Sequence, residues 1–236
     1  MIRGLREILP DNGKAFSSIL ISLKTRNFRL YFTGMCVSLT GTWMQQVAMS
    51  WLVYRLTGSV FLLATVTFMA QIPILLVTPL MSVFVDRFDR QKILILTQSL
   101  SMVQALSMAA LTLSGVIEVW HILILSLLIG CINALDNPTR QAFYPSLVAK
   151  EHLSNAIALN SAVINGSRLI GPAVGGVLIG IFGEGLCFLL NGISYLGVII
   201  ACLLLPFSTA GKMCSQIYKK VSPMCPVTFP YGPCCC

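Results

Sequence analysis

Charge is scarce in this sequence. Only 10% of its 236 residues are Asp, Glu, Lys or Arg, and 56% are hydrophobic. A soluble domain of this size usually carries about a quarter of charged residues. Because so few charges cannot keep a chain of this composition in water, the sequence excludes an ordinary soluble globule and predicts a membrane protein.

The motifs of common enzyme sites are missing as well. The sequence has no His-Glu-x-x-His metal motif, no Gly-x-Ser-x-Gly nucleophile motif and no glycine-rich phosphate loop. Its two histidines, His121 and His152, lie far apart. We therefore expect no catalytic residues and no metal or cofactor site, and ATP is not the expected energy source of this chain.

Six apolar stretches are long enough to cross a bilayer, which takes roughly 20 residues as a helix. Backbone polar groups in lipid must be satisfied within the segment, so each stretch is predicted to be helical. The expected spans are Leu30–Tyr54, Val60–Phe84, Ile93–Leu113, Val119–Leu135, Ile157–Phe182 and Leu186–Pro206. The sequence thus predicts an all-α membrane protein with a six-span bundle over residues 30–206, an N-terminal segment over 1–29 and a tail over 207–236.

Lysine and arginine are distributed unevenly around these spans. All sixteen basic residues except Arg55 and Arg168 fall in the N-terminal segment, in the loops after the second and fourth spans, or in the tail. Basic residues mark the cytoplasmic side of a multi-pass protein, so we expect both termini in the cytoplasm. Basic loops facing anionic lipid account for the net charge of +8, and nucleic acid is not an expected partner.

Five charged residues are gathered between the second and third spans, in the stretch VDRFDRQK over residues 85–92. The cations help to hold this loop inside, but acidic residues contribute little to orientation. A carboxylate at the end of a span can instead pair with an arginine or face the positive end of a helix. We therefore expect Asp86, Arg87 and Arg90 to form a latch between helix bundles at the cytoplasmic face.

Two stretches resemble motifs of the major facilitator superfamily. Residues 82–92 are similar to its loop signature G-x-x-x-D-R-x-G-R-[RK]: Asp86, Arg87 and Arg90 match, whereas Ser82, Asp89 and Gln91 differ. In the fifth span, GPAVGG over residues 171–176 resembles the Gly-Pro motif of proton-exchanging exporters. Independently of the family, Gly171, Gly175 and Gly176 leave one helix face bare for close packing, and Pro172 favours a kink; ordinary small-residue packing remains an equal alternative.

Further stretches resemble a narrower branch, which includes the enterobactin exporter and macrolide-efflux-like proteins. They are RNFRLYF at 26–32, GTWMQ at 41–45, NALDNP at 133–138 and NSA at 160–162. This resemblance covers about residues 20–207. It implies a multi-pass inner-membrane transporter that uses a proton gradient to export small amphipathic molecules such as siderophores or drugs. It also implies that residues 30–206 form the N-terminal bundle of a two-bundle fold, built as an inverted three-plus-three repeat.

Polar side chains within the spans are the candidates for substrate or proton binding, because an ionisable group at membrane depth usually faces a cavity or a partner. Arg168, halfway through the fifth span, is expected to line a water-filled cavity and attract an anion; the alternative is a structural hydrogen-bond donor. Asp136 is a proton candidate or a helix-end carboxylate. Weaker candidates, which are more often interhelical hydrogen bonds, are Gln45, Gln46, Gln71 and Asn165.

The tail over residues 207–236 changes composition abruptly, with four prolines and five of the nine cysteines. We expect it to be out-of-frame or disordered sequence that follows a truncated half-transporter. Such a half needs a second six-span half or self-association, with the bilayer and a small-molecule substrate as its other partners. The alternative is a non-transporting six-span remnant or an accessory subunit of a full transporter.

Overall fold

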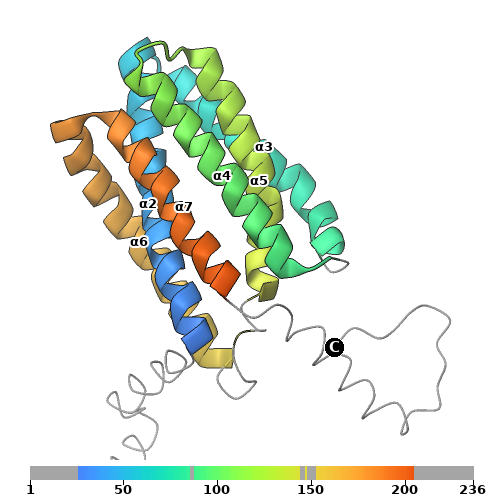
Figure 1. The fold of residues 1–236 in the computed structure, drawn as a ribbon. Helices are drawn as coiled ribbons and strands as arrows, with labels where there is room; N and C mark the ends of the chain where they lie inside the picture. Colours follow the sequence, from blue (N-terminus) through green and yellow to red (C-terminus); the bar gives the residue numbers. More distant parts are fainter. Residues whose placement is uncertain (1–25, 86–87, 144–146, 148–152, 205–236) are drawn as a thin grey trace, which may run out of the picture. The chain divides into compact units, whose positions relative to one another are not determined.

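The computed structural model describes residues 26–85, 88–143, 147 and 153–204. All the regular structure in this part of the chain is helical (Figure 1). The six helices are α2 (Arg26–Thr57), α3 (Val60–Val85), α4 (Arg90–Leu113), α5 (Val119–Phe143), α6 (Leu153–Phe182) and α7 (Glu184–Leu204). The prediction of an all-α bundle with six helices is confirmed, whereas the tail over 207–236 and most of the segment over 1–29 lie outside the described residues.

Five of the six helices are long and apolar enough to cross a membrane: α3, α4, α5, α6 and α7. The exception, α2, has the length, with 32 residues, but it contains adjacent glutamines, Gln45 and Gln46, together with several Ser and Thr. Its polar residues lower its hydropathy. Because many of them are buried against other helices, α2 lies at the centre of the packing and not on a lipid-facing edge.

The helices pack in two equivalent sets. Helix α3 packs on α5 as α6 packs on α2, and α4 packs on α5 as α7 packs on α2; α4 and α7 contact each other. Exchanging the triplet α2–α3–α4 with the triplet α5–α6–α7 therefore reproduces the contact pattern. Two three-helix units related by a pseudo-two-fold axis are expected to pack in this way, although their sequences show no clear identity.

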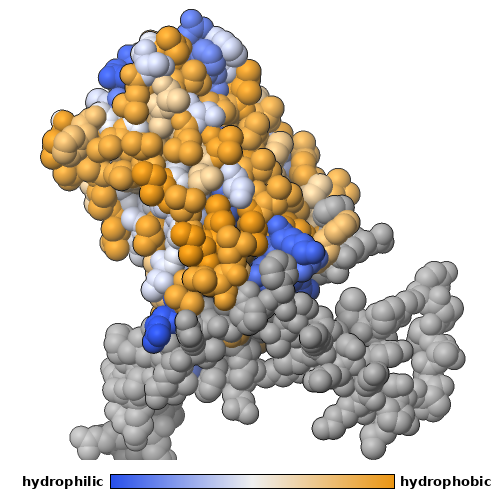
Figure 2. All heavy atoms as spheres, viewed as in Figure 1, coloured by the Kyte–Doolittle hydropathy of each residue, from blue (hydrophilic) through white to orange (hydrophobic). Residues whose placement is uncertain are grey.

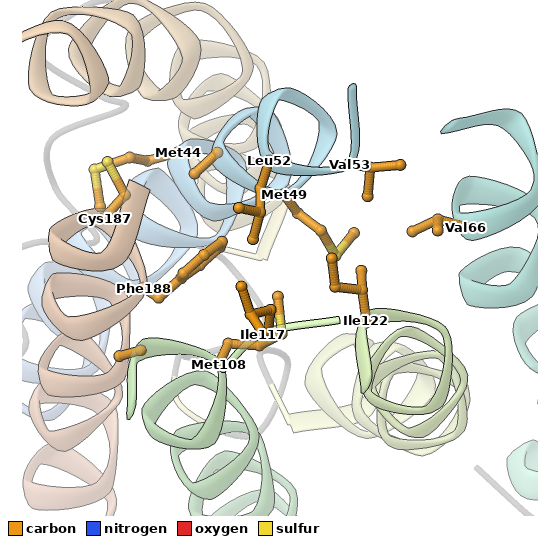
Figure 3. Packing of buried hydrophobic residues seen from close by; sticks show 12 residues of the cluster. Met44, Met49, Leu52, Val53, Val66, Met108, Ile117, Ile122, Cys187 and Phe188 are labelled. Atoms are coloured by element: carbon orange, nitrogen blue, oxygen red, sulfur yellow. The ribbon is translucent and has the colours of Figure 1, made fainter. Parts of the chain in front are cut away.

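The buried apolar core lies between α2, α3, α4, α5 and α7 (Figure 3). Met49, Leu52 and Val53 of α2 face Met108 of α4 and Phe188 of α7 in this cluster. Long apolar side chains also cover the outside of the bundle, especially on α3 and α6, and Figure 2 shows this apolar surface in orange. An apolar exterior of this kind is suited to lipid or to another bundle.

Glycines set the distance between α6 and α2. Ser167, Gly171 and Gly175 are buried at intervals of four residues, on the face of α6 that meets α2. A Cβ atom at Gly171 would lie 2.5 Å from Cβ of Trp43 and 2.9 Å from the carbonyl oxygen of Thr40. Small residues thus let the two backbones approach more closely than larger side chains would allow.

Two glycines of the same motif give a matched test of this packing. We expect Gly171→Ala to destabilise the bundle by about 1–3 kcal/mol, because the new methyl group overpacks the contact with α2. Gly176→Ala should be neutral or stabilising by up to about 1 kcal/mol, because alanine is the better helix former and nothing lies within 4 Å of the new Cβ. Thermal unfolding in detergent measures both. Equal melting temperatures for the two variants would contradict the assigned packing.

Candidate functional site

The end of the bundle at which α2, α4 and α6 begin, here called the basic end, contains Arg90. Its Nη1 atom donates a hydrogen bond of 3.0 Å to the carbonyl oxygen of Ala142, near the last residue of α5. Arginine near a helix C-terminus satisfies otherwise unpaired carbonyls and complements the helix dipole. Arg90 therefore ties the start of α4 to the end of α5. The other two residues of the expected latch, Asp86 and Arg87, lie outside the described residues.

Asp89, where the superfamily signature has glycine, has a local role. It is the N-cap of α4, and its Oδ1 atom accepts a hydrogen bond of 3.1 Å from the backbone nitrogen of Gln91. Aspartate is a preferred N-cap residue. The departure from the signature therefore starts the helix without removing Arg90 from its position.

Asp136 forms a buried polar cluster close to the basic end. Its side chain accepts hydrogen bonds from Thr97 Oγ1 at 2.6 Å and Gln98 Nε2 at 2.9 Å, both from α4. Arg140, one turn further along α5, donates to the other carboxylate oxygen. The cluster links α4 to α5. The i, i+4 spacing of Asp136 and Arg140 was visible in the sequence as a helical ion pair, whereas the two partners from α4 were not expected.

A network of amides and hydroxyls crosses the middle of the bundle. Gln45 donates to Gln104 of α4 at 3.1 Å and accepts from Asn191 of α7 at 2.6 Å. Asn191 Nδ2 also lies 3.3 Å from the hydroxyl of Tyr195, which is 3.3 Å from Thr42 Oγ1. Gln45 thus occupies an interhelical network, the alternative to a substrate contact. Gln104 and Asn191 were missed, although an amide inside an apolar run signals such a bond.

Arg168 lies near the midpoint of α6, fifteen residues after Leu153 and fourteen before Phe182. Its guanidinium carbon is 4.9 Å from the ring centroid of Trp43, a cation–π distance. Together with Trp43, Gln46, Val47, Ser50 and Pro172, it lines an open hollow of about 370 Å³ between α2 and α6. The four residues of α2 recur at helical spacing and occupy one face, so the hollow follows from the sequence pattern once the two helices are adjacent.

The remaining candidates lie apart from this hollow or at its margin. Gln71 is exposed on α3. Asn165 is exposed one turn before Arg168, and its Nδ2 atom donates to the carbonyl oxygen of Ser161 at 2.8 Å. Gly176 faces open space. The structure therefore brings Gln46, Arg168 and Pro172 together and places Asp136 and Gln45 in two separate clusters.

Acidic and metal-binding groups do not compete for Arg168 in the described part of the chain. The buried carboxylates there are Asp136, paired with Arg140, and Glu184, whose Oε1 atom lies 3.2 Å from Nε of Arg55. Within the same residues, no cluster of His, Cys, Asp and Glu could hold a metal ion. What the hollow offers chemically is one positive charge, two polar side chains and an aromatic surface.

Comparison with known proteins gives a consistent family. The family model described as transmembrane secretion effector matches residues 17–214. The chain is 30% identical to the staphyloferrin A transporter of Staphylococcus aureus over 76% of its own length and 45% of that protein. It is 27% identical to macrolide efflux protein A of Streptococcus pyogenes, over 66% of its own length and 39% of that protein.

A third relative is an uncharacterized MFS-type transporter of Bacillus subtilis, 26% identical over 70% of this chain and 39% of that protein. The chain thus spans less than half the length of these curated relatives. No solved structure matches it significantly.

The Asp136 cluster predicts energetic coupling between its two charges. Asp136→Asn or Arg140→Gln alone leaves one charge poorly paired in a buried position, and each should destabilise the bundle by about 3 kcal/mol. The double variant should lose less than the sum of the single losses. Denaturation by sodium dodecyl sulfate measures this double-mutant cycle, with the exposed Lys92→Gln as a neutral control. Additive losses would show that the two charges do not depend on each other.

Proposed function

Because the chain belongs to the transmembrane secretion effector family of the major facilitator superfamily, we propose that it forms one six-helix half of a secondary active exporter. The proposed cargo is a small amphipathic molecule such as a siderophore or a drug. The observation that carries this proposal, beyond family membership, is the hollow beside Arg168 near mid-depth. Polar and charged side chains at that depth are costly against lipid and normally face a water-filled path or a partner.

We propose that transport requires a second six-helix bundle. Major facilitator transporters hold their substrate between two six-helix halves near the bilayer midplane, and this chain matches 45% or less of its curated relatives. The exposed faces of α3 and α6 carry long apolar side chains, such as Leu76 and Leu169, on which another bundle could pack. A second copy of this chain or a separate half would supply it.

We propose an inner-membrane location with the basic end of the bundle in the cytoplasm. Arg29, Arg90, Lys92 and Arg140 lie toward that end, whereas Arg55 lies at the other. This distribution is the one that the positive-inside rule associates with cytoplasmic loops. Cargo would then pass from the basic end, through the region between two bundles, to the opposite side.

Proton coupling is assigned to Asp136 in this proposal. Of the two buried carboxylates among the described residues, Glu184 is held by Arg55 at the opposite end, whereas Asp136 lies near the proposed cytoplasmic end. Its partners Thr97 and Gln98 come from α4. A shift of α4 against α5 would remove two hydrogen bonds from the carboxylate, and loss of such donors favours uptake of a proton.

The latch at the start of α4 is proposed to favour one of the two open states. Asp86→Asn should then change the exposure of the basic end while leaving membrane insertion intact, because it removes a charge from the Asp86, Arg87 and Arg90 group. The measurement is the rate at which a thiol reagent labels a cysteine introduced at Ala142, which accepts the hydrogen bond from Arg90. Asp89→Asn, at the N-cap, is the control. An unchanged labelling rate and unchanged export in Asp86→Asn would refute the latch.

Export is tested in everted membrane vesicles that contain this chain together with the C-terminal bundle of a related exporter. We expect uptake of a siderophore or a macrolide to depend on both bundles and to stop when a protonophore collapses the gradient. Asp136→Asn should abolish cargo-dependent proton release, and Asp136→Glu should retain part of it, when equal amounts of folded protein are compared.

Two outcomes would change this assignment. Uptake that survives both the protonophore and Asp136→Asn would remove proton coupling through this residue. If no pairing of bundles transports either cargo, the second candidate function, a non-transporting six-span accessory subunit, would be favoured.

A further inference from the structure

The hollow between α2 and α6 contains a positive charge that the described residues leave without a counter-ion. Arg168 is exposed, and in this part of the chain it makes no ion pair or side-chain hydrogen bond; its recorded contact is the face of Trp43. By contrast, Arg55 and Arg140 each contact a carboxylate. Arg168 is therefore the basic side chain near mid-depth that remains available to an outside anion.

The geometry prepares the guanidinium for an anion. An arginine stacked on an aromatic ring is held by its flat face, and its N–H groups remain at the edge, where they match the two oxygens of a carboxylate. Gln46 and Ser50 lie on the same side of α2, three and seven residues after Trp43, and line the hollow with it. Ser50 uses its hydroxyl hydrogen on the backbone of Gln46, whereas the Gln46 side chain is exposed.

A lipid headgroup is a poor match for this position. Arg168 is fifteen residues from one end of α6 and fourteen from the other, which places it about 20 Å from either end along the helix. Headgroups lie at the membrane surfaces, so an anion at this depth has to arrive through a water-filled space. The apolar wall from Val47 and Pro172 would contact a non-polar part of the same molecule.

We propose that this hollow is a cargo subsite for a carboxylate attached to an apolar or aromatic group, with Arg168 binding the carboxylate and Trp43 positioning Arg168. This inference rests on the proposed export function, and it narrows the cargo to anionic amphipaths over cationic ones. It applies to this chain without a second bundle, because both helices that line the hollow belong to it.

The test uses Trp43 fluorescence in neutral-lipid nanodiscs, in a Trp51→Phe, Trp120→Phe background. Both removed tryptophans are about half exposed, so the fold should tolerate their loss. Iodide should quench Trp43 about fivefold more strongly than caesium, because a single unpaired positive charge within contact distance concentrates anions by about that factor. The preference should vanish in Arg168→Gln and persist in Arg168→Lys, with acrylamide quenching and the melting temperature as controls for folding.

A second arm identifies the chemistry of the ligand. Benzoate should protect Trp43 from iodide, whereas benzylammonium at the same ionic strength should not. The proposal is overturned if neither ion quenches Trp43, which would place the hollow against lipid. It is equally overturned if iodide and caesium quench alike, or if benzoate gives no protection.

The quenching and export experiments fail separately. Anion-selective quenching without any vesicle export would retain the subsite and remove the proposed export function. Export without anion-selective quenching would do the reverse.

Discussion

The need to satisfy polar groups inside an apolar bundle governs this structure. A polar group transferred out of water without a hydrogen-bond partner costs several kcal/mol, and a bilayer offers no water to repair the loss. The chain meets this constraint with pairs of polar residues on different helices. Gln45, Gln104 and Asn191 join α2, α4 and α7 at the middle, and Asp136 joins α5 to α4 near the basic end. These bonds add direction to a packing that apolar contact alone would leave free to slide.

Glycine and the polar network act together in the same helix pairs. Gly41 lies where α2 meets Asn191 and Ser194 of α7, and a Cβ there would approach the Asn191 side chain within 2.5 Å. Close approach of the backbones is therefore a condition for the hydrogen bond between Gln45 and Asn191. On the other side of α2, Gly171 and Gly175 bring α6 close without a comparable amide network. The α2–α7 contact is thus fixed by bonds, and the α2–α6 contact mainly by shape.

The sequence was sufficient for the helices because each is a long apolar run, and hydropathy depends on composition and not on partners. It was insufficient for the clusters, because pairing between helices depends on rotation about each helix axis. Asp136 and Arg140 share a helix, so their ion pair could be read from spacing. Thr97 and Gln98 approach Asp136 only when α4 faces α5. The Gly-Pro motif shows both cases: its bare face was visible, but which glycine meets α2 was not, and Gly171 does so whereas Gly176 does not.

The same reasoning explains why Arg168 stands out. In a structure where buried polar groups are largely matched with one another, an exposed arginine near mid-depth with an aromatic ring as its recorded contact is an exception. Replacing Arg168 with an apolar residue would remove a membrane-depth charge without breaking any recorded ion pair, so stability gives no reason to retain it. Its position across from Gln46 and Ser50, on the face of α6 that is not packed into the bundle core, instead matches a requirement set from outside the bundle, which a passing anion would supply.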